Sequence, residues 1–422
     1  MTPLKRREFI KLAGAATALS LAGCASVGGS KPKVVVIGGG FGGATAARYI
    51  RKWDPSIEVV MVEREASFTS CPMSNLVIGG NRSIDEIRRT YDGLRRVGVQ
   101  VVTDEVTAVD TRTRVVKLAR GGDLTYDRLV VSPGIDFMFD TIEGYETALG
   151  AQKVLHAWKA GPQTVALRSQ LERMPDGGVY LISIPSAPYR CPPGPYERVC
   201  QVAHYFKTRK PRSKILVLDA NQDIVSKGKL FREAWTSLYP GMIDYKPQSN
   251  VVGVDGGSMA VKTEFDTVKA DVLNVVPAQR AGSIAAGAGL VTHNNRWCDV
   301  DWMTCESKAA KNVHIIGDAT LSAPAMPKSG HMANSQAKVC AAAVVALING
   351  QAPDPTPVVN NTCYSYVSDK EVVHVASVHQ WDAGAKTLQP VKDAGGLSQA
   401  RNQLEGPLAW GWAQNIWADT LG

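Results

Sequence analysis

The sequence predicts an α/β protein with two successive nucleotide-binding units and a small C-terminal domain. Three observations support this prediction. Residues 34–37 form a short apolar run that leads into a glycine-rich turn, residues 177–184 form a second apolar run, and residues 313–316 form a third that ends on Gly-Asp. Short apolar runs bounded by turn residues are typical of buried parallel strands.

The glycine-rich turn, Gly38-Gly39-Gly40-Phe41-Gly42-Gly43, has the G-x-G-x-x-G pattern of a Rossmann-like dinucleotide-binding domain. Gly38 permits the tight turn after the strand, and Gly40 lets the backbone approach a pyrophosphate. Gly43 lets the following helix pack closely on the strand. The pattern alone is a weak signal, because a glycine turn can also serve without a ligand.

The elements after this turn strengthen the prediction. A helix is expected over residues 44–52, and its N-terminus offers unpaired N–H groups to phosphates. A second strand over residues 57–62 ends on Glu63, which can accept a hydrogen bond from a ribose hydroxyl. Strand, helix and acidic residue all fall where a bound dinucleotide requires them.

Composition sets broad limits on function. The chain has 422 residues, of which 45% are hydrophobic and 20% charged, and its formal net charge is +8. This length leaves room for two or three domains. No basic run is interleaved with aromatic residues, which argues against nucleic-acid binding, and no cysteine or histidine spacing matches a metal site.

The N-terminus, residues 1–30, has the form of an export signal. Lys5-Arg6-Arg7-Glu8-Phe9-Ile10-Lys11 resembles a twin-arginine signal, and the apolar stretch after it is too short to span a bilayer. Leu21-Ala22-Gly23-Cys24 resembles a lipoprotein cleavage box. Cys24 is therefore either lipidated or discarded, and we expect a periplasmic protein that contacts a membrane only if Cys24 is lipidated.

Two further segments indicate that the dinucleotide is FAD. Residues 124–134, which end on Gly134, resemble the second signature of two-dinucleotide-domain flavoproteins. Residues 313–319 match the third signature, in which an aspartate, here Asp318, holds the ribityl chain; a plain strand-to-turn junction is the alternative. Pro327-Lys328-Ser329-Gly330 then precedes a helix over 331–347 whose N-terminus is expected to face the flavin.

These signatures divide the chain. The FAD-binding domain is predicted to be discontinuous, over 31–144 and 284–352, with a second Rossmann-like domain over 145–283 and an interface domain over 353–422. The second unit has a proline-rich turn at 185–197 in place of a second glycine fingerprint. Because prolines lack N–H donors, a nicotinamide dinucleotide is not expected to bind there.

The cysteines fall into two groups. Cys71 lies in the loop after the second strand, where it is an attachment point, a redox thiol or an inert buried residue. Cys200 lies at helical spacing with Tyr196, Val199 and Ala203, and Cys340 lies inside the helix expected over 331–347. Both are expected to pack in the core. Cys298 and Cys305 either pair or, as we expect, remain unpaired.

Four segments together resemble the flavoprotein subunit of flavocytochrome c sulfide dehydrogenase, a relative of sulfide:quinone oxidoreductase. They are residues 69–75, 191–197, 327–330 and 361–364. The resemblance implies that Cys71 carries FAD through a thioether. It also implies that Cys191 and Cys363 form a redox disulfide over the flavin, with Glu197 near it.

The resemblance implies oxidation of a small sulfur substrate, sulfide, by attack of hydrosulfide on this disulfide. Glu197 would then either handle protons or serve only as a first-turn helix carboxylate. The chain has no C-x-x-C-H haem site, so a cytochrome c partner must be a separate subunit, and C-terminal Trp410, Trp412 and Trp417 are candidates for its docking surface or for a cover. A membrane-peripheral sulfide:quinone oxidoreductase is the alternative; a non-catalytic flavoprotein and an NADH-linked reductase are less favoured.

Overall fold

Strand β1 (Lys33–Ile37) is the centre of the first domain in the computed structural model, which describes residues 31–422. It pairs in parallel with β2 (Glu58–Glu63) and with β9 (Arg128–Val131), within a sheet of order β20-β21-β22-β9-β1-β2-β5. The remaining strands of this sheet are β5 (Gln100–Thr103), β20 (Val300–Asp301), β21 (Glu306–Ser307) and β22 (Val313–Ile315). The α/β class with two dinucleotide-type domains is confirmed.

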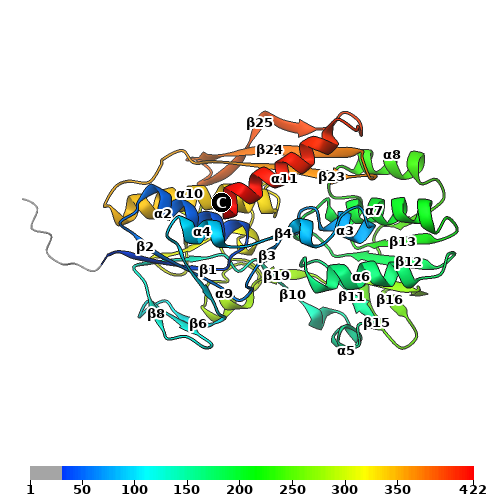
Figure 1. Ribbon diagram of the computed structural model, residues 1–422, viewed down its shortest axis with the longest axis horizontal. Helices are drawn as coiled ribbons and strands as arrows, with labels where there is room; N and C mark the ends of the chain where they lie inside the picture. Colours follow the sequence, from blue (N-terminus) through cyan, green and yellow to red (C-terminus); the bar gives the residue numbers. More distant parts are fainter. Residues whose placement is uncertain (1–30) are drawn as a thin grey trace, which may run out of the picture.

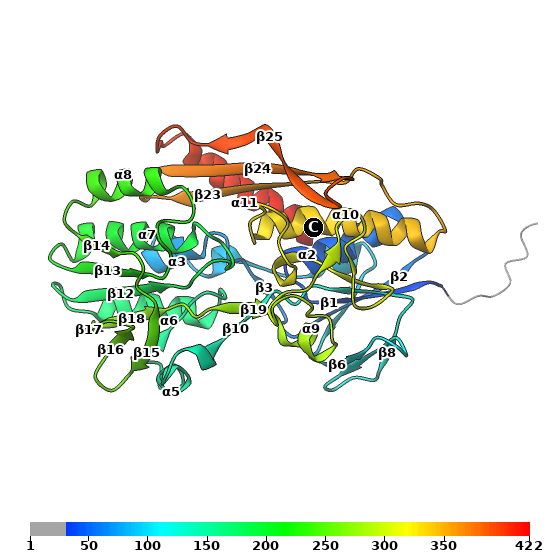
Figure 2. The same ribbon diagram turned by 180° about the vertical axis from the view of Figure 1, so that it is seen from behind.

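The central strand is apolar because both faces of the sheet are covered. Val34 and Val36 face the cluster built around α2 (Phe41–Trp53) and α10 (Gly330–Ile348), whereas Val35 faces the opposite cluster. The small sheet of β6 (Val106–Asp110), β7 (Val115–Leu118) and β8 (Leu124–Thr125) and the helix α9 (Ser283–Gly287) lie on that opposite side (Figures 1 and 2).

Helix α2 begins at Phe41, earlier than the expected start at residue 44. Gly42 and Gly43 of the motif are therefore part of the helix, and Gly43 allows it to approach the strand. A Cβ placed on Gly43 would lie 1.9 Å from the Gly38 carbonyl oxygen, and one on Gly38 would lie 2.3 Å from the Ser132 carbonyl oxygen. Close packing of this helix on this sheet thus requires glycine at both positions.

The second domain is a parallel sheet of order β11-β18-β12-β13-β14 flanked by helices (Figure 1). Its strands are β11 (Val154–Leu155), β12 (Val179–Ile184), β13 (Lys214–Asp219), β14 (Ile243–Lys246) and β18 (Val272–Val275). Its helices are α5 (Tyr145–Gly150), α6 (Pro162–Arg173), α7 (Gly194–Arg209) and α8 (Gly228–Leu238), and a small sheet joins β15 (Val251–Asp255), β16 (Ala260–Thr263) and β17 (Thr267–Lys269).

The chain passes between the two domains on one antiparallel pair. Strand β10 (Ile135–Phe137) leaves the first domain, and β19 (Gln279–Ala281) returns beside it. Strand β22 then adds to the first sheet next to β9. The first domain is consequently built from two separate parts of the sequence.

The C-terminal residues form an antiparallel sheet and a long helix, which lie along both domains (Figures 1 and 2). The elements are β23 (Val358–Tyr366), β24 (Val372–Asp382), β25 (Thr387–Leu397) and α11 (Glu405–Leu421). Ser329 of the first domain donates a hydrogen bond to Asn361, and Gln201 of the second domain donates one to the Tyr366 carbonyl at 3.1 Å. Strand β23 therefore bridges the two domains.

The C-terminal tryptophans do not form one exposed surface. Trp417 is 2% exposed, and its indole N–H donates to Ser70 Oγ at 2.9 Å. The Arg89 guanidinium lies over its ring at 4.0 Å. Helix α11 packs on α2, which turns this tryptophan into the first domain. Trp417, which the sequence predicted at a docking surface or a cover, is therefore a core residue.

No helix in residues 31–422 is long and apolar enough to cross a membrane. The expected export signal and Cys24 lie outside the described residues.

Candidate functional site

A cavity of about 1170 Å³ lies at the carboxyl ends of the strands of the first sheet, where α/β proteins bind their ligands. All three domains contribute to its lining. Most of the predicted site residues line it: Gly38, Gly40, Glu63, Cys71, Gly134, Cys191, Glu197, Asp318, Ser329, Gly330 and Cys363. Gly43 and Lys328 do not line it.

The N-terminus of α2 opens into this cavity without a cap from the protein. Gly40 precedes the helix, no side chain caps it, and the first turn carries no acidic residue. A Cβ on Gly40 would meet nothing within 4 Å. Glu63 Oε2 accepts a hydrogen bond from the Gly39 N–H at 2.6 Å, so the acidic residue also steadies the glycine turn. The free N–H groups and the open space above Gly40 fit a bound diphosphate.

Asp318 presents an unpaired carboxylate to the same cavity. It lies on the short helix η3 (Gly317–Ala319), directly after β22, and its Oδ1 is buried without a hydrogen-bond partner among the described residues. Burial raises the pKa of this carboxyl. A buried acceptor without a donor is costly, so the position fits a ligand that brings a hydroxyl group. A ribityl chain carries such hydroxyls, and the residues present therefore fit FAD.

Lys328 binds the backbone of the loop that carries Asp318 and does not face the cavity. Its Nζ donates to the Asp318 carbonyl at 3.0 Å and to the Thr320 carbonyl, and it lies 3.7 Å from the centre of the Trp297 ring. Burial lowers the pKa of Lys328 to about 8. Its side chain is thus committed to the protein, whereas the next residue, Ser329, caps α10 by accepting from the Met332 N–H at 3.0 Å.

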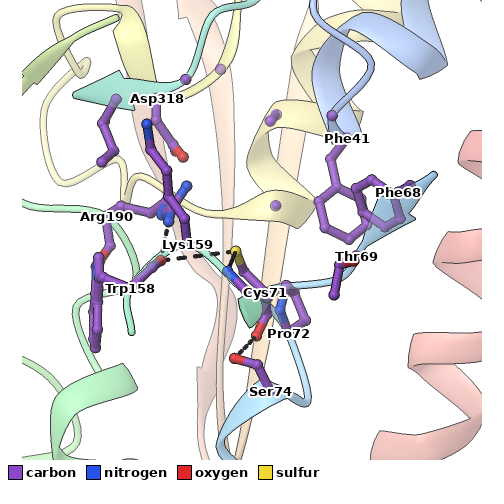
Figure 3. A pocket seen from close by; sticks show the side chains of 18 of the residues that line it. Phe41, Phe68, Thr69, Cys71, Pro72, Ser74, Trp158, Lys159, Arg190 and Asp318 are labelled. Atoms are coloured by element: carbon purple, nitrogen blue, oxygen red, sulfur yellow. Dashed lines mark hydrogen bonds between the residues drawn. The ribbon is translucent and has the colours of Figure 1, made fainter. Parts of the chain in front are cut away.

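Cys71 lies in the loop between β3 (Phe68–Thr69), which pairs with β4 (Arg88–Arg89), and α3 (Ser74–Gly79). Figure 3 shows its sulfur beside the segment that carries Trp158 and Lys159. The Ala160 N–H donates to Cys71 Sγ at 3.5 Å, and Ser74 Oγ donates to the Cys71 carbonyl at 2.7 Å. The sulfur is half-buried at the cavity wall, where it can reach a bound group.

Cys191 and Cys363 reach the cavity from different domains. Cys191 sits in the proline-rich turn before α7 with φ +58°, and its N–H donates to the Lys328 carbonyl at 2.8 Å. Cys363 projects from β23, with its Sγ 3.4 Å from the Asn361 amide nitrogen. Both are free thiols, and burial raises the pKa of each. Both residues line the same cavity, and the negative charge of Cys363 raises the pKa of Cys191 further.

Glu197 lies in the first turn of α7 but is only 8% exposed. Its carboxylate accepts from Asn75 Nδ2 at 2.8 Å and from the Tyr366 N–H at 2.9 Å. Burial raises the pKa of this carboxyl, which favours a proton on it. The position suits proton transfer better than a solvent-exposed helix carboxylate would.

Two buried cations at this site were not expected from the sequence. Arg198 donates to the Asn75 side chain at 3.0 Å and to the carbonyls of His156 and Ala157. Lys227 donates to the Cys363 carbonyl at 2.9 Å. Only the position of Arg198 next to Glu197 hinted at a role, and nothing in the sequence around Lys227 marks it.

The other described cysteines serve packing. Cys200 and Cys340 are fully buried, as expected, and the Trp235 indole N–H donates to Cys200 Sγ at 3.3 Å. Cys298 and Cys305 are both buried free thiols and do not pair. No group of residues in 31–422 has the arrangement of a metal site.

Comparison with known families places these segments. Residues 164–277 match the family described as sulfide dehydrogenase [flavocytochrome c] flavoprotein chain, central, and residues 355–421 match flavocytochrome c sulphide dehydrogenase, flavin-binding. Residues 32–173 match pyridine nucleotide-disulphide oxidoreductase.

Individual proteins agree with this placement. The sulfide dehydrogenase [flavocytochrome c] flavoprotein chain of Chlorobaculum thiosulfatiphilum is 60% identical over 45 residues, which cover 11% of this chain and 94% of that sequence. The mitochondrial sulfide:quinone oxidoreductase of Dictyostelium discoideum is 25% identical over 298 residues, or 68% of this chain, and the match spans 65% of that relative's length.

A solved structure shows the same fold. The sulfide:quinone oxidoreductase of Aquifex aeolicus superposes with a TM-score of 0.74 at 17% identity, over 92% of this chain and 91% of the other. These matches, together with the cavity and its cysteines, identify the family: the chain belongs to the flavoprotein chains of flavocytochrome c sulfide dehydrogenase, which are related to the sulfide:quinone oxidoreductases.

Proposed function

We propose that this protein oxidises sulfide to sulfane sulfur with FAD and a redox disulfide between Cys191 and Cys363. The observation that carries the proposal is the convergence of Cys71, Cys191, Cys363 and Asp318 on one cavity from four separate segments. Both relatives described above are named for sulfide oxidation, which agrees with this chemistry.

The cavity residues divide the binding of FAD among them. The N-terminus of α2 with Gly40 would hold the pyrophosphate, and Glu63 the ribose. Asp318 would accept from the ribityl hydroxyls, and Cys71 would bind the isoalloxazine ring covalently. Bound FAD would supply a two-electron acceptor that can release electrons one at a time.

The sulfur chemistry belongs to the two cysteines. Hydrosulfide attacks one sulfur of the Cys191–Cys363 disulfide, which leaves a persulfide on that residue and a thiolate on the other. A second hydrosulfide or another thiol removes the sulfane sulfur, which leaves both cysteines reduced. The disulfide re-forms when the two cysteines lose two electrons, which bound FAD would accept. Glu197, buried beside the pair and biased toward its protonated form, would hold or release the proton that these steps require.

The electron acceptor we propose is a haem on a separate cytochrome c subunit, since this chain has no C-x-x-C-H site of its own. The family description, which names a flavocytochrome c, supports this choice. Because residues 1–30 resemble a twin-arginine signal, we place the reaction in the periplasm. Quinone is the second candidate acceptor, favoured by the similarity to sulfide:quinone oxidoreductases.

Replacement of Asp318 by Asn tests the FAD assignment, and it is best made in a Cys71→Ser background so that FAD can be removed. Loss of a charge-assisted hydrogen bond should weaken FAD binding by about tenfold or more, measured by fluorescence titration.

The folded-state pKa of Asp318 is raised, so its contribution to the stability of the cofactor-free protein is full at low pH and is lost as pH rises through that pKa. D318N should therefore be more stable than its parent at neutral pH, a gain that disappears in acid.

Asp136, which also lines the cavity, offers a control of opposite sign. Burial opposes its ionisation, but Lys159 at 2.9 Å holds the pKa of Asp136 below its ordinary value. D136N should lower stability at neutral pH, and the loss should shrink as pH falls. If the free energy of unfolding of the cofactor-free protein depended on pH in the same way in D318N and in its parent, a buried, unpaired carboxylate at Asp318 would be contradicted.

Replacement of Cys71 by Ser should make FAD removable without unfolding the site. After acid precipitation, the flavin should stay with the wild-type protein and pass into the supernatant from C71S, as followed by absorbance. Cys191→Ser is the matched control, because its sulfur lies in the same cavity and should leave the attachment intact. Flavin that is released equally from wild-type protein would rule out the covalent bond.

Anaerobic addition of sulfide tests the disulfide. Near-stoichiometric sulfide should bleach the visible flavin absorbance of the wild-type protein. Cys191→Ser and Cys363→Ser should bind FAD normally yet show no bleaching at the same concentration, because neither can form the disulfide. Bleaching of both variants at the wild-type rate would refute the mechanism.

Steady-state turnover separates the two acceptors. With sulfide present, the purified protein should reduce a c-type cytochrome only when the haem subunit is supplied. A short-chain quinone should not substitute for it. Rapid sulfide-dependent reduction of quinone in the absence of any cytochrome would replace our proposal with the quinone-linked alternative.

A further inference from the structure

Lys227 is a buried cation whose role is not explained by the binding of FAD. It directly precedes α8, is 5% exposed and has a left-handed backbone with φ +58°. Its Nζ donates to the Cys363 carbonyl at 2.9 Å, to Ser365 Oγ at 2.8 Å and to the Val373 carbonyl at 3.2 Å. An ammonium has three donors, so all of them are used.

The neighbours of Lys227 leave its charge without a direct counter-ion. Within residues 31–422, no carboxylate lies within salt-bridge distance of its Nζ. A buried cation without a paired anion is uncommon, because loss of water disfavours the charged form. Burial accordingly lowers the pKa of Lys227 to about 8, and the nearby Cys363 opposes this change.

The alternation of side chains along β23 puts Cys363 on the same face as Ser365, whose hydroxyl binds Lys227. Side chains two residues apart on a strand lie on the same face. Ser365 touches the ammonium of Lys227 through its side chain, and Asn361 touches Cys363 Sγ. Asn361, Cys363 and Ser365 therefore share one face of the strand, and Lys227 lies against that face.

The surroundings of Cys191 and Cys363 differ in charge. For both thiols burial is the largest influence and raises the pKa. For Cys363 the next influence is Lys227, which lowers the pKa, followed by the hydrogen bond from Asn361. For Cys191 the next influences are the negative charges of Cys363 and Glu197, which raise the pKa, and Arg190 and Lys227 lower it by less. Glu197 also raises the pKa of Cys363, but by less than Lys227 lowers it. Negative charge is thus better tolerated on Cys363.

We propose that Lys227 is a positioning residue that makes Cys363 the thiolate and Cys191 the acceptor of sulfur when the disulfide opens. This inference rests on the redox pairing proposed above. Hydrosulfide forms a bond to Cys191 Sγ, the Cys191–Cys363 bond breaks, and its electron pair passes to Cys363 Sγ. The disulfide is the two-electron oxidant of this step, so no other oxidant is needed. The new anion arises on β23, the strand that Lys227 contacts.

The test measures which cysteine is the better nucleophile in the reduced holoenzyme. After chemical reduction of the disulfide, a sub-stoichiometric amount of iodoacetamide is added near neutral pH, and the labelled peptides are quantified by mass spectrometry. Because the thiolate is the reactive form, the wild-type protein should be labelled mainly on Cys363. In Lys227→Met, the ratio of Cys363 to Cys191 labelling should fall by about tenfold, the effect of one unit of thiol pKa.

Two further variants separate charge from hydrogen bonding. Lys227→Gln can still donate to the carbonyls of β23 and β24 but has no charge, so its ratio should match that of K227M. Lys227→Arg keeps the charge and should restore most of the wild-type preference. Lys229→Met, two residues along on α8 and exposed, is the matched control and should label as wild type does.

The position of the added sulfur gives a readout that does not depend on access of the reagent. After one equivalent of sulfide and an acid quench, peptide mapping should find the added sulfur mainly on Cys191 in the wild-type protein and shifted toward Cys363 in K227Q. A wild-type labelling ratio and sulfur distribution in a folded K227Q would overturn the proposal. Absence of any Cys191–Cys363 disulfide in the oxidised wild-type protein would instead overturn the proposed function on which it rests.

Discussion

The contact between α2 and β1 is the constraint on which the rest of the structure depends. Glycines at positions 38 and 43 let backbone approach backbone at distances that any Cβ would block. The helix N-terminus is thereby fixed at the edge of the sheet, directly beside the ends of β9 and β22. Two further cavity residues of the first domain lie at this edge: Asp318 follows β22, and the Cys71 loop follows β3.

Four buried ionisable groups lie in the cavity wall or contact residues that line it. Asp318, Glu197, Lys227 and Lys328 are each shielded from water, and each has its pKa displaced by burial toward the neutral form. In such surroundings charges interact more strongly than in water. Glu197 and Lys227 are the two of these groups that contact β23, the strand that carries Cys363 and bridges both domains.

The sequence allowed much of the FAD site to be predicted, since those residues are fixed by local backbone requirements. Gly38, Gly40 and Asp318 occupy turns at strand ends, and a turn of this kind can be recognised from a few neighbouring residues. Lys328 was expected at the cofactor but instead supports the Asp318 loop, because its side chain points toward Trp297 and two carbonyls. The direction of a side chain cannot be inferred from its position in a motif.

The sulfur site could not be assembled from local patterns. Cys191 and Cys363 lie in different domains, and only the family resemblance suggested that they act together. Lys227 and the sheet β23–β25 were not predicted at all, because their roles arise from contacts between distant segments. Trp417 was expected at an interface or cover and proved to be a core residue, since it contacts Ser70 beside Cys71, Arg89 of β4 and Trp410.

The measurement that tests the central claim most directly is peptide mapping of the purified, oxidised protein under non-reducing conditions. The account predicts one linked pair of peptides, containing Cys191 and Cys363, and the loss of this link after one equivalent of sulfide with an added sulfur on one of the two. Recovery of both cysteines as free thiols from the oxidised protein, or a link that sulfide does not open, would contradict it.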